Sequence, residues 1–127
     1  MTSANRADEP LIKDNGQAIK ELSGICEYFL AHDRDILNRC DDSIVQVMNG
    51  KPVVLRRGRG YAPFPFSLRA PLKQSAGCGA QLKSTLCLTK GGQAFVSQYI
   101  GDLQNFGTAG FYRETFGCKE GDFPVTE

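Results

Sequence analysis

Apolar residues recur at helical spacing early in the chain. Asp14 precedes Gln17 by three residues, which approximates a capping box at a helix start. The apolar positions that follow at this spacing are Ile19, Leu22, Cys26 and Phe29, with Ile25 and Leu30 widening the stripe. The pattern predicts an amphipathic helix of about four turns. Because Gly24 weakens its middle, tertiary packing has to hold this helix, and we interpret it as scaffold.

The pattern then changes to a period of two. Ser43 to Met48 is β-branched and apolar, and Asn49-Gly50 is a strong signal for a two-residue turn. Val53 to Leu55 returns as the partner strand. Pro52 lies just after the turn, where an edge strand tolerates a missing donor. These residues predict a β-hairpin.

A proline-rich stretch separates this hairpin from a second one. Residues 56–72 contain Pro63, Pro65 and Pro71, which exclude a long helix and predict an extended connector. Alternating residues from Leu82 to Thr89, a Gly91-Gly92 turn and a return from Ala94 to Ile100 predict the second hairpin.

The aromatic residues near the end of the chain predict one last helix. They are Phe106, Phe111, Tyr112 and Phe116. We expect Gly117 to end this helix and the tail after it to be frayed. Each side of the connector holds fewer than about 75 residues, a size that is marginal without staples or partners. The pattern therefore favours a piece of a larger α+β protein.

Composition and charge exclude several classes of protein. The 127 residues are 41% hydrophobic and 23% charged, and the formal net charge is +1. No global field therefore favours nucleic acid or membrane. No apolar run approaches the roughly 18 residues of a membrane span, and the start does not resemble a secretory signal. We expect a cytoplasmic protein.

Five cysteines and one histidine, His32, do not form a pattern typical of zinc ligands. The odd cysteine count and the loose spacing also argue against a disulfide framework. We expect no metal site made by this chain alone, and we expect most of the cysteines to be small buried apolar groups.

An arginine cluster is the most suggestive chemical feature. Arg56, Arg57 and Arg59 can match phosphate or carboxylate oxygens in pairs, and the intervening glycines let backbone approach a ligand. With Tyr61, Phe64 and Phe66 the same stretch could bind single-stranded nucleic acid. On spacing alone we favour a plainer interpretation, a solvated basic linker.

Two further groups of polar residues are weaker candidates. Ser3 and Asn5 offer a hydroxyl and an amide side by side, although both are ordinary turn residues. Arg39, Asp41 and Ser43, together with Asp42, crowd the entry to the first hairpin. They fit a Mg²⁺ or ribose site, or a plain ion pair at a strand end.

Three long segments together resemble a known family. They are MTSAN followed by DEP, HDRDILNRCDDSIVQVMNGKPVVLRRGRGYAP at residues 32–63, and GAQLKSTLCLTKGGQAFVSQYIGDLQN at residues 79–105. The first resembles the Ser-x-Asn loop of YrdC-like domains, and the second resembles the HypF version of that domain. The third is similar to the opening hairpin of the actin-like (ASKHA) domain of HypF carbamoyltransferases. The resemblance covers roughly residues 1 to 116.

The resemblance implies a division of the chain and a reaction. Residues 1–61 would be the C-terminal part of a YrdC-like domain, with its helix and hairpin, and residues 62–76 a linker. Residues 77–127 would open the actin-like domain with a hairpin and a short helix. HypF-like proteins use ATP, with Mg²⁺, and carbamoyl phosphate to make carbamoyl adenylate. They then pass the carbamoyl group to the C-terminal cysteine of HypE in [NiFe]-hydrogenase maturation.

The resemblance also assigns residues to that chemistry. The residues that match nucleotide- and carbamoyl phosphate-binding positions are Ser3, Asn5, Arg39, Asp41, Ser43, Arg56 and Arg59. Lys83, Ser84 and Thr85 occupy the hairpin whose turn faces nucleotide phosphates in actin-like folds.

The departures from the family matter as much as the matches. The Lys–Arg pair of YrdC-like domains, the zinc-finger cysteines and the histidine cluster are expected outside these residues, and Tyr99 stands where the family usually has histidine. We therefore expect a fragment that is inactive alone. The alternatives are a split subunit completed by other chains, and a YrdC-like module that binds nucleotide or double-stranded RNA.

Overall fold

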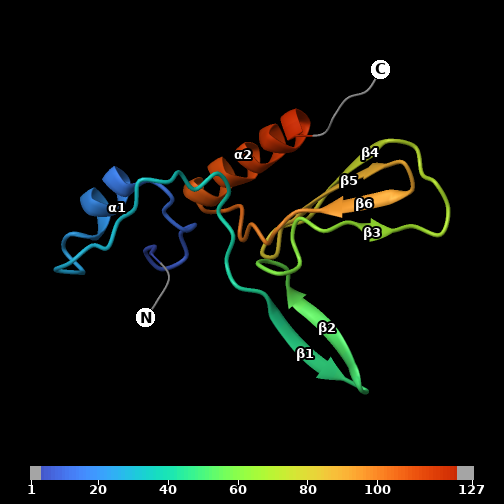
Figure 1. The fold of residues 1–127 in the computed structure, drawn as a ribbon, viewed down its shortest axis with the longest axis horizontal. Coiled ribbons are helices and arrows are strands. Elements are labelled where there is room, and N and C mark those ends of the chain that lie inside the picture. The colour runs from blue at the N-terminus through green and yellow to red at the C-terminus, as the bar shows by residue number, and fades with distance from the viewer. Residues whose placement is uncertain (1–3, 123–127) are drawn as a thin grey trace.

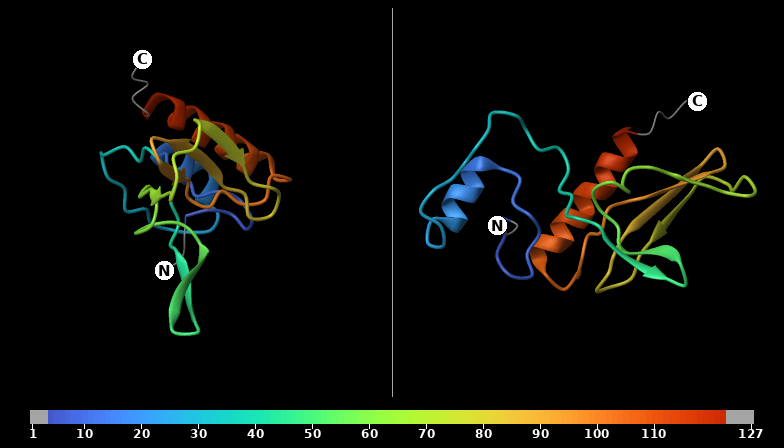
Figure 2. Two further views of the ribbon diagram at one scale, coloured as in Figure 1. Left: turned by 90° about the vertical axis from the view of Figure 1, so that its right-hand side faces the viewer. Right: turned by 60° about the horizontal axis from the view of Figure 1, so that its bottom comes forward.

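The computed structural model describes residues 4–122, and the side chains of residues 4–117. Helix α1 (Asn15–Leu22) comes first, followed by the hairpin strands β1 (Ile44–Met48) and β2 (Lys51–Arg56). A second sheet contains β3 (Phe66–Ser67), β4 (Ser75–Cys78), β5 (Leu86–Lys90) and β6 (Gln93–Val96). Helix α2 (Phe106–Asp122) ends the described chain. In Figure 1 and the right-hand view of Figure 2, α2 lies between α1 and the second sheet. The predicted α+β class is confirmed.

Helix α1 begins as predicted but is much shorter. The Asp14 carboxylate accepts a hydrogen bond from the Gln17 amide at 2.7 Å, so Asp14 is the N-cap. The helix has only 8 residues, and the prediction of four turns reaching Leu30 is wrong. Ile25 and Leu30 are exposed side chains of the segment after the helix. A short helix depends on burying its apolar face, and no described element covers the face that these residues would form.

The first hairpin has the predicted strands and turn. Asn49 and Gly50 both have positive φ, 50° and 72°, which is the geometry of a tight hairpin turn. Val47 pairs with Pro52, and a register shift between Ile44 and Val45 marks a bulge. The two strands form a sheet of their own, with unpaired edges on both sides. Figure 1 and the left-hand view of Figure 2 show this hairpin projecting away from the rest of the chain.

The second sheet has four antiparallel strands in the order β3-β6-β5-β4. Gly91 and Gly92, with φ of 58° and 79°, form the predicted turn between β5 and β6. Residues 82–85, expected in the strand, precede it instead, because Leu82 has a φ of 73° that a strand excludes. The flanking strands β3 and β4 were not predicted. Strand β3 lies inside the proline-rich stretch that was expected to be an extended connector, and β4 begins just after it.

The core lies in the second half of the chain. Leu86, Ile100 and Phe111 form a buried cluster, and Leu103, Tyr112 and Phe116 pack against it. Helix α2 has 17 residues and continues through Gly117, so the predicted helix end at Gly117 is wrong. The predicted frayed tail lies partly in residues 123–127, outside the described residues.

The whole chain exposes far more surface than a compact protein of its size. Its solvent-accessible area is 9641 Å². A compact monomer of 13.9 kDa would expose roughly 6,700 Å² by the scaling of surface with mass. The excess of roughly 3,000 Å² is large enough for extensive contacts with other polypeptide.

No described helix has the length and hydropathy needed to cross a membrane.

Candidate functional site

Four of the predicted binding residues meet where the hairpin begins and ends. The backbone amide of Arg59 donates to the carbonyl of Asp41 at 2.9 Å. The Ser43 hydroxyl accepts from the amide of Gly58 at 2.8 Å and donates to the carbonyl of Arg59 at 2.9 Å. We call residues 41–43 and 56–59 the arginine junction. It fixes the chain on either side of β1 and β2.

Glycine is required at position 58 of the arginine junction. A Cβ atom added there would lie 2.1 Å from the carbonyl oxygen of Asp41 and 3.2 Å from the carbonyl carbon of Asp42. Both are backbone atoms, so neither can rotate away as a side chain could. The two segments approach each other this closely only because Gly58 has no side chain.

The charges of the junction are paired, but unequally exposed. Arg56 forms an ion pair with Asp41 at 3.0 Å, and its Nε donates to the carbonyl of Asp42 at 2.9 Å. Arg59 pairs with Asp42 at 3.0 Å, and the side chains of this second pair are 66% and 73% exposed. An exposed pair contributes only about 0.2–1 kcal/mol. Arg59 can therefore turn to an incoming anion at small cost, whereas Arg56 is already oriented.

Arg57, which the sequence analysis grouped with its neighbours, has a different position. Its guanidinium donates to the carbonyls of Val96, Tyr61 and Phe64 and lies 4.6 Å from the centre of the Phe66 ring. Burial lowers the pKa of Arg57. Its own carbonyl accepts from the Tyr99 amide at 2.7 Å. Arg57 therefore joins the arginine junction to the segment after β6. The sequence alone does not distinguish this inward arginine from Arg56 and Arg59.

A small hollow brings three other predicted residues together. Its volume is about 80 Å³, and its lining includes Asn5, Arg39 and Asp41. Tyr99 and Phe111 line the same hollow from the second half of the chain. The Asn5 amide donates to the carbonyls of Arg6 and Glu9, so it also closes a turn of the N-terminal segment. Ser3, the partner predicted for Asn5, lies outside the described residues.

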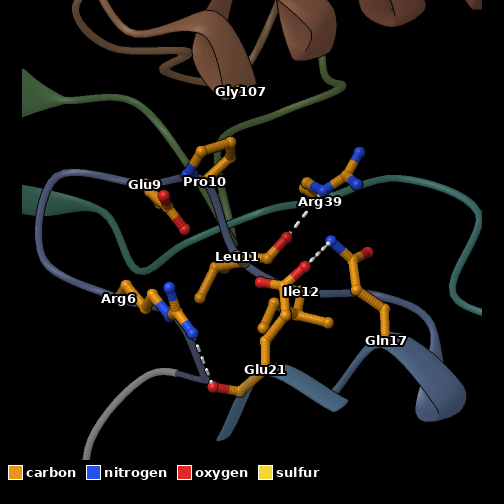
Figure 3. A pocket seen from close by; sticks show the side chains of 9 residues that line it. All are labelled: Arg6, Glu9, Pro10, Leu11, Ile12, Gln17, Glu21, Arg39 and Gly107. Atoms are coloured by element: carbon orange, nitrogen blue, oxygen red, sulfur yellow. Dashed lines mark hydrogen bonds between the residues drawn. The ribbon is translucent and has the colours of Figure 1, made fainter.

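A larger hollow of about 390 Å³ lies beside the first one, and Arg39 borders both. Figure 3 shows Arg39 donating to the carbonyl of Leu11, a bond of 2.6 Å, and Arg6 donating to the carbonyl of Glu21, a bond of 3.2 Å. The residues that line it are Arg6, Glu9, Pro10, Leu11, Ile12, Gln17, Glu21, Arg39 and Gly107. Both arginines therefore use part of their donor capacity on backbone.

Lys83, Ser84 and Thr85 lie before β5, at the end of the strand away from the Gly91-Gly92 turn. Ser84 has no exposed surface, and its backbone bonds to Ile100 and Gly101. Lys83 is exposed. Among the described residues, this group is bonded to the segment after β6 and not to the arginine junction.

The described part of the chain offers little to a metal ion. Among residues 4–117, no group of three or more His, Cys, Asp or Glu side chains is arranged to hold one. Cys26, Cys40, Cys78 and Cys87 are free. Burial raises the pKa of Cys40, against the lowering effect of the Arg59 charge. The carboxylates of Asp41 and Asp42 are already engaged with arginines.

Comparisons with known proteins find relatives that match both halves of the chain. The Sua5–YciO–YrdC family model, described as "Telomere recombination", matches residues 1–58. The model described as "HypF Kae1-like domain" matches residues 71–120. The carbamoyltransferase HypF of Rhizobium leguminosarum is 46% identical over 113 residues, which are 89% of this chain and 15% of the relative. The probable carbamoyltransferase HypF of Methanocaldococcus jannaschii is 43% identical over 90% of this chain and 15% of its own length.

This chain belongs to the HypF family. The crystal structure of full-length HypF in the phosphate- and nucleotide-bound form superposes with a TM-score of 0.90 at 40% identity. That match covers 98% of this chain and 20% of the HypF chain. The T. kodakarensis HypF structure gives a TM-score of 0.89 at 38% identity, over 98% of this chain and 16% of its own. The chain spans about 15% of the length of the curated HypF relatives it matches.

The two family-model matches confirm the resemblance to HypF and the order of its YrdC-like and HypF Kae1-like parts. The YrdC-like match covers α1 and the first hairpin, and the HypF Kae1-like match covers β4, β5, β6 and most of α2. The zinc implied by the HypF resemblance finds no suitable ligand group among residues 4–117. The hydroxyl of Tyr99, which stands at a position where histidine was expected, donates to the carbonyl of Leu82 at 3.1 Å.

Proposed function

We propose that this chain is part of a HypF-type carbamoyltransferase, and that its first half contributes to a site for ATP and carbamoyl phosphate. The observation that carries the proposal is the unbroken similarity to HypF across both halves, with a TM-score of 0.90 to a phosphate- and nucleotide-bound HypF. In the overall reaction, ATP, carbamoyl phosphate and water would give carbamoyl adenylate, pyrophosphate and inorganic phosphate. A cytoplasmic location belongs to the proposal, because ATP is the substrate.

The arginine junction supports this proposal through its charge and its rigidity. Arg56 is oriented by Asp41 and by the Asp42 carbonyl, so its fork needs little reorganisation to meet a phosphate oxygen. Arg59 is exposed and can turn from Asp42 to a ligand. In this proposal Asp41 and Ser43 hold the arginines in place rather than bind the anion themselves.

The hollow next to the junction supplies the remaining predicted ligand groups. Asn5 and Arg39 line it together with Asp41. We propose that Asn5 and Ser3 orient the substrate, and that Arg39 adds positive charge at its edge. Mg²⁺ bound to ATP would supply further charge neutralisation, with phosphate oxygens and waters among its ligands.

For the second half, we propose the start of the domain that transfers the carbamoyl group to the C-terminal cysteine of HypE. Lys83 is exposed and available to a phosphate group, whereas Ser84 is buried and would contribute through its backbone. Thr85 is half-buried beside them. The proposed division remains 1–61, a linker at 62–76, and 77–127. The sheet includes β3 and the start of β4 from the linker.

The exposed apolar surface supports a further part of this proposal, that other HypF-type polypeptide, in the same chain or in another, covers these side chains in the active protein. Most of the exposed large apolar side chains belong to the first half. The missing parts of HypF are the partners that would cover them.

The proposal is tested in a chimaera of Rhizobium leguminosarum HypF in which this chain replaces the segment it matches. Carbamoyl phosphate-dependent release of pyrophosphate from ATP is measured. Arg56→Ala should reduce the rate about a hundredfold, because one preorganised donor to developing phosphoryl charge is lost. Arg69→Ala, at an exposed arginine between β3 and β4, should leave it unchanged. Equal rates for the two variants would contradict the assignment of Arg56.

A further inference from the structure

One carboxylate joins the two halves of the chain. Glu114 lies on α2, and each of its oxygens has a different cationic partner from the first half. Oε1 accepts from the ammonium group of Lys13, and Oε2 accepts from the guanidinium group of Arg39. Lys13 lies 101 positions away in sequence. These pairs are half-buried, with side-chain exposures between 16% and 32%, so solvent screens them less than a surface pair.

Arg39 is itself held by other contacts. Its Nε donates to the Leu11 carbonyl at 2.6 Å, and its guanidinium carbon lies 5.6 Å from the centre of the Phe111 ring. Phe111 belongs to the buried core of the second half. The planar guanidinium thus contacts a first-half carbonyl, the Glu114 carboxylate and an aromatic ring of that core at once.

The same face of α2 approaches the N-terminal segment at a third place, where Gly107 lies beside Pro10. Gly107, Phe111 and Glu114 are spaced four and three residues apart, so they lie on one face of the helix. A Cβ atom added at Gly107 would lie 3.2 Å from Cδ of Pro10, so the helix backbone and the N-terminal segment are nearly in contact. This face carries all three contacts.

The pKa of Glu114 is consistent with a carboxylate that is bound to two cations. Burial acts to raise its pKa, but the hydrogen bond from Lys13 and the charges of Arg39 and Lys13 outweigh it, and the net shift is downward. The carboxylate is therefore ionised across the physiological pH range.

We propose that Glu114 is a positioning residue, which fixes α2 against Lys13 and Arg39. It thereby holds two candidate sites in a constant relative position: the first site, at the arginine junction and its hollow, and the second site, at residues 83–85. Arg39 lines the hollow that also contains Asn5 and Asp41, and its bond to the Leu11 carbonyl does not involve Glu114. Loss of the carboxylate should therefore move α2 relative to the first site more than it changes that site. The part of this inference that concerns catalysis rests on the proposed function. The contact of Glu114 with Lys13 and Arg39, which we call the clamp, does not depend on the proposed function.

The clamp is tested on the full 127-residue chain by thiol labelling resolved residue by residue. Cys40 is half-buried and adjacent to Arg39, while Cys87 is half-buried in β5. Glu114→Gln should speed labelling of Cys40 about tenfold, because about 1.4 kcal/mol of pairing is lost. Cys87 should be unaffected. Arg113→Gln, at the exposed neighbouring position of α2, is the matched control and should change neither thiol.

Two outcomes of the labelling experiment would overturn the clamp. One is an unchanged Cys40 rate in Glu114→Gln, which would mean that the carboxylate fixes nothing. The other is equal acceleration at Cys40 and Cys87, which would mean that the substitution loosens the whole fold rather than the contact between the halves. Lys13→Gln should reproduce part of the Cys40 effect, because it removes one of the two pairs.

The positioning role is tested in the HypF chimaera by separating the two partial reactions. Glu114→Gln should keep pyrophosphate release within about twofold and lower transfer of the carbamoyl group to the acceptor cysteine about tenfold. Equal losses in both steps, or no loss in either, would overturn the positioning role. A wild-type chimaera that releases no pyrophosphate would instead contradict the proposed function, and the labelling result would still decide the clamp.

Discussion

The first half of the chain, residues 4–61, and the second half, residues 62–122, differ in what covers their apolar side chains. In the second half, Leu86, Ile100 and Phe111 bury one another between the sheet and α2. In the first half, Leu22 is the one buried apolar residue described. The large apolar side chains that the first half exposes are Ile19, Ile25, Tyr28, Phe29, Leu30, Ile36, Leu37, Ile44, Val45, Val47, Met48, Val53, Val54 and Leu55.

This difference indicates how each half holds its shape. The second half has side chains that exclude water from one another, so local contacts stabilise it. The first half is held by hydrogen bonds and ion pairs of the arginine junction and by its contacts with α2. A two-stranded hairpin without a covered face is marginal in water. The arginine junction therefore lies in the half that depends more on neighbouring polypeptide.

The largest effect should come from removing the core of the second half. Phe111→Ala should lower the free energy of unfolding by about 3–5 kcal/mol, because it leaves a cavity beneath α2. Phe111 is 6% exposed, whereas Phe106 on the same helix is 98% exposed. Phe106→Ala should therefore change stability by less than about 0.5 kcal/mol. Urea unfolding followed by circular dichroism measures both, and similar losses would remove the distinction between core and surface.

A smaller effect, confined to the first half, should follow from Gly58→Ala. The new methyl group would meet the Asp41 carbonyl and force the two segments of the junction apart, at a cost of about 1–3 kcal/mol. Amide exchange at Arg59, whose N–H bonds to Asp41, should accelerate while β5 and β6 keep their protection. Gly24→Ala places the same methyl group in open space and serves as the control. Normal protection of Arg59 in Gly58→Ala would contradict the close approach.

The smallest effect should come from acidification of the contact between the halves. The pKa of Glu114 is lowered in the folded chain, so its contribution is complete above the ordinary value of 4.5 and is lost as pH falls through the lowered value. Labelling of Cys40 should therefore accelerate below about pH 4.5 relative to Cys87, once both rates are corrected for thiolate content. Glu114→Gln should remove this pH dependence, and its persistence would assign the effect to another group.

Local signals in the sequence predicted both hairpins. Asn49-Gly50 and Gly91-Gly92 require positive φ, and the structure places them in the two turns. Strand β3 could not be predicted, because it is two residues long and exists only by pairing Phe66 with Ala94 and Ser67 with Gln93. Its formation depends on a partner far along the chain rather than on its own composition.

For helix α1, the sequence predicted a longer element than the structure contains. Residues 23–30 have apolar positions at helical spacing, yet they lie outside the helix, and all of them except Cys26 are exposed. Periodicity predicts a helix only if a surface exists for it to cover, and the described chain supplies none there.

The candidate site was predicted in part. The family resemblance brought Asp41, Ser43, Arg56 and Arg59 forward, and the structure places them in one junction. Glu114 was not predicted, because no local pattern links it to Lys13 across 101 positions. Long-range charge pairs of this kind have no signature in a single sequence.

The central claim is that the first half needs surfaces beyond this chain, whereas the second half has a core of its own. Hydrogen exchange measured by mass spectrometry on the 127-residue chain and on the HypF chimaera tests it directly. Strands β1 and β2 should exchange at least about tenfold more slowly in the chimaera, while β5 and β6 should change little. Equal exchange of the first hairpin in the two proteins would contradict the central claim.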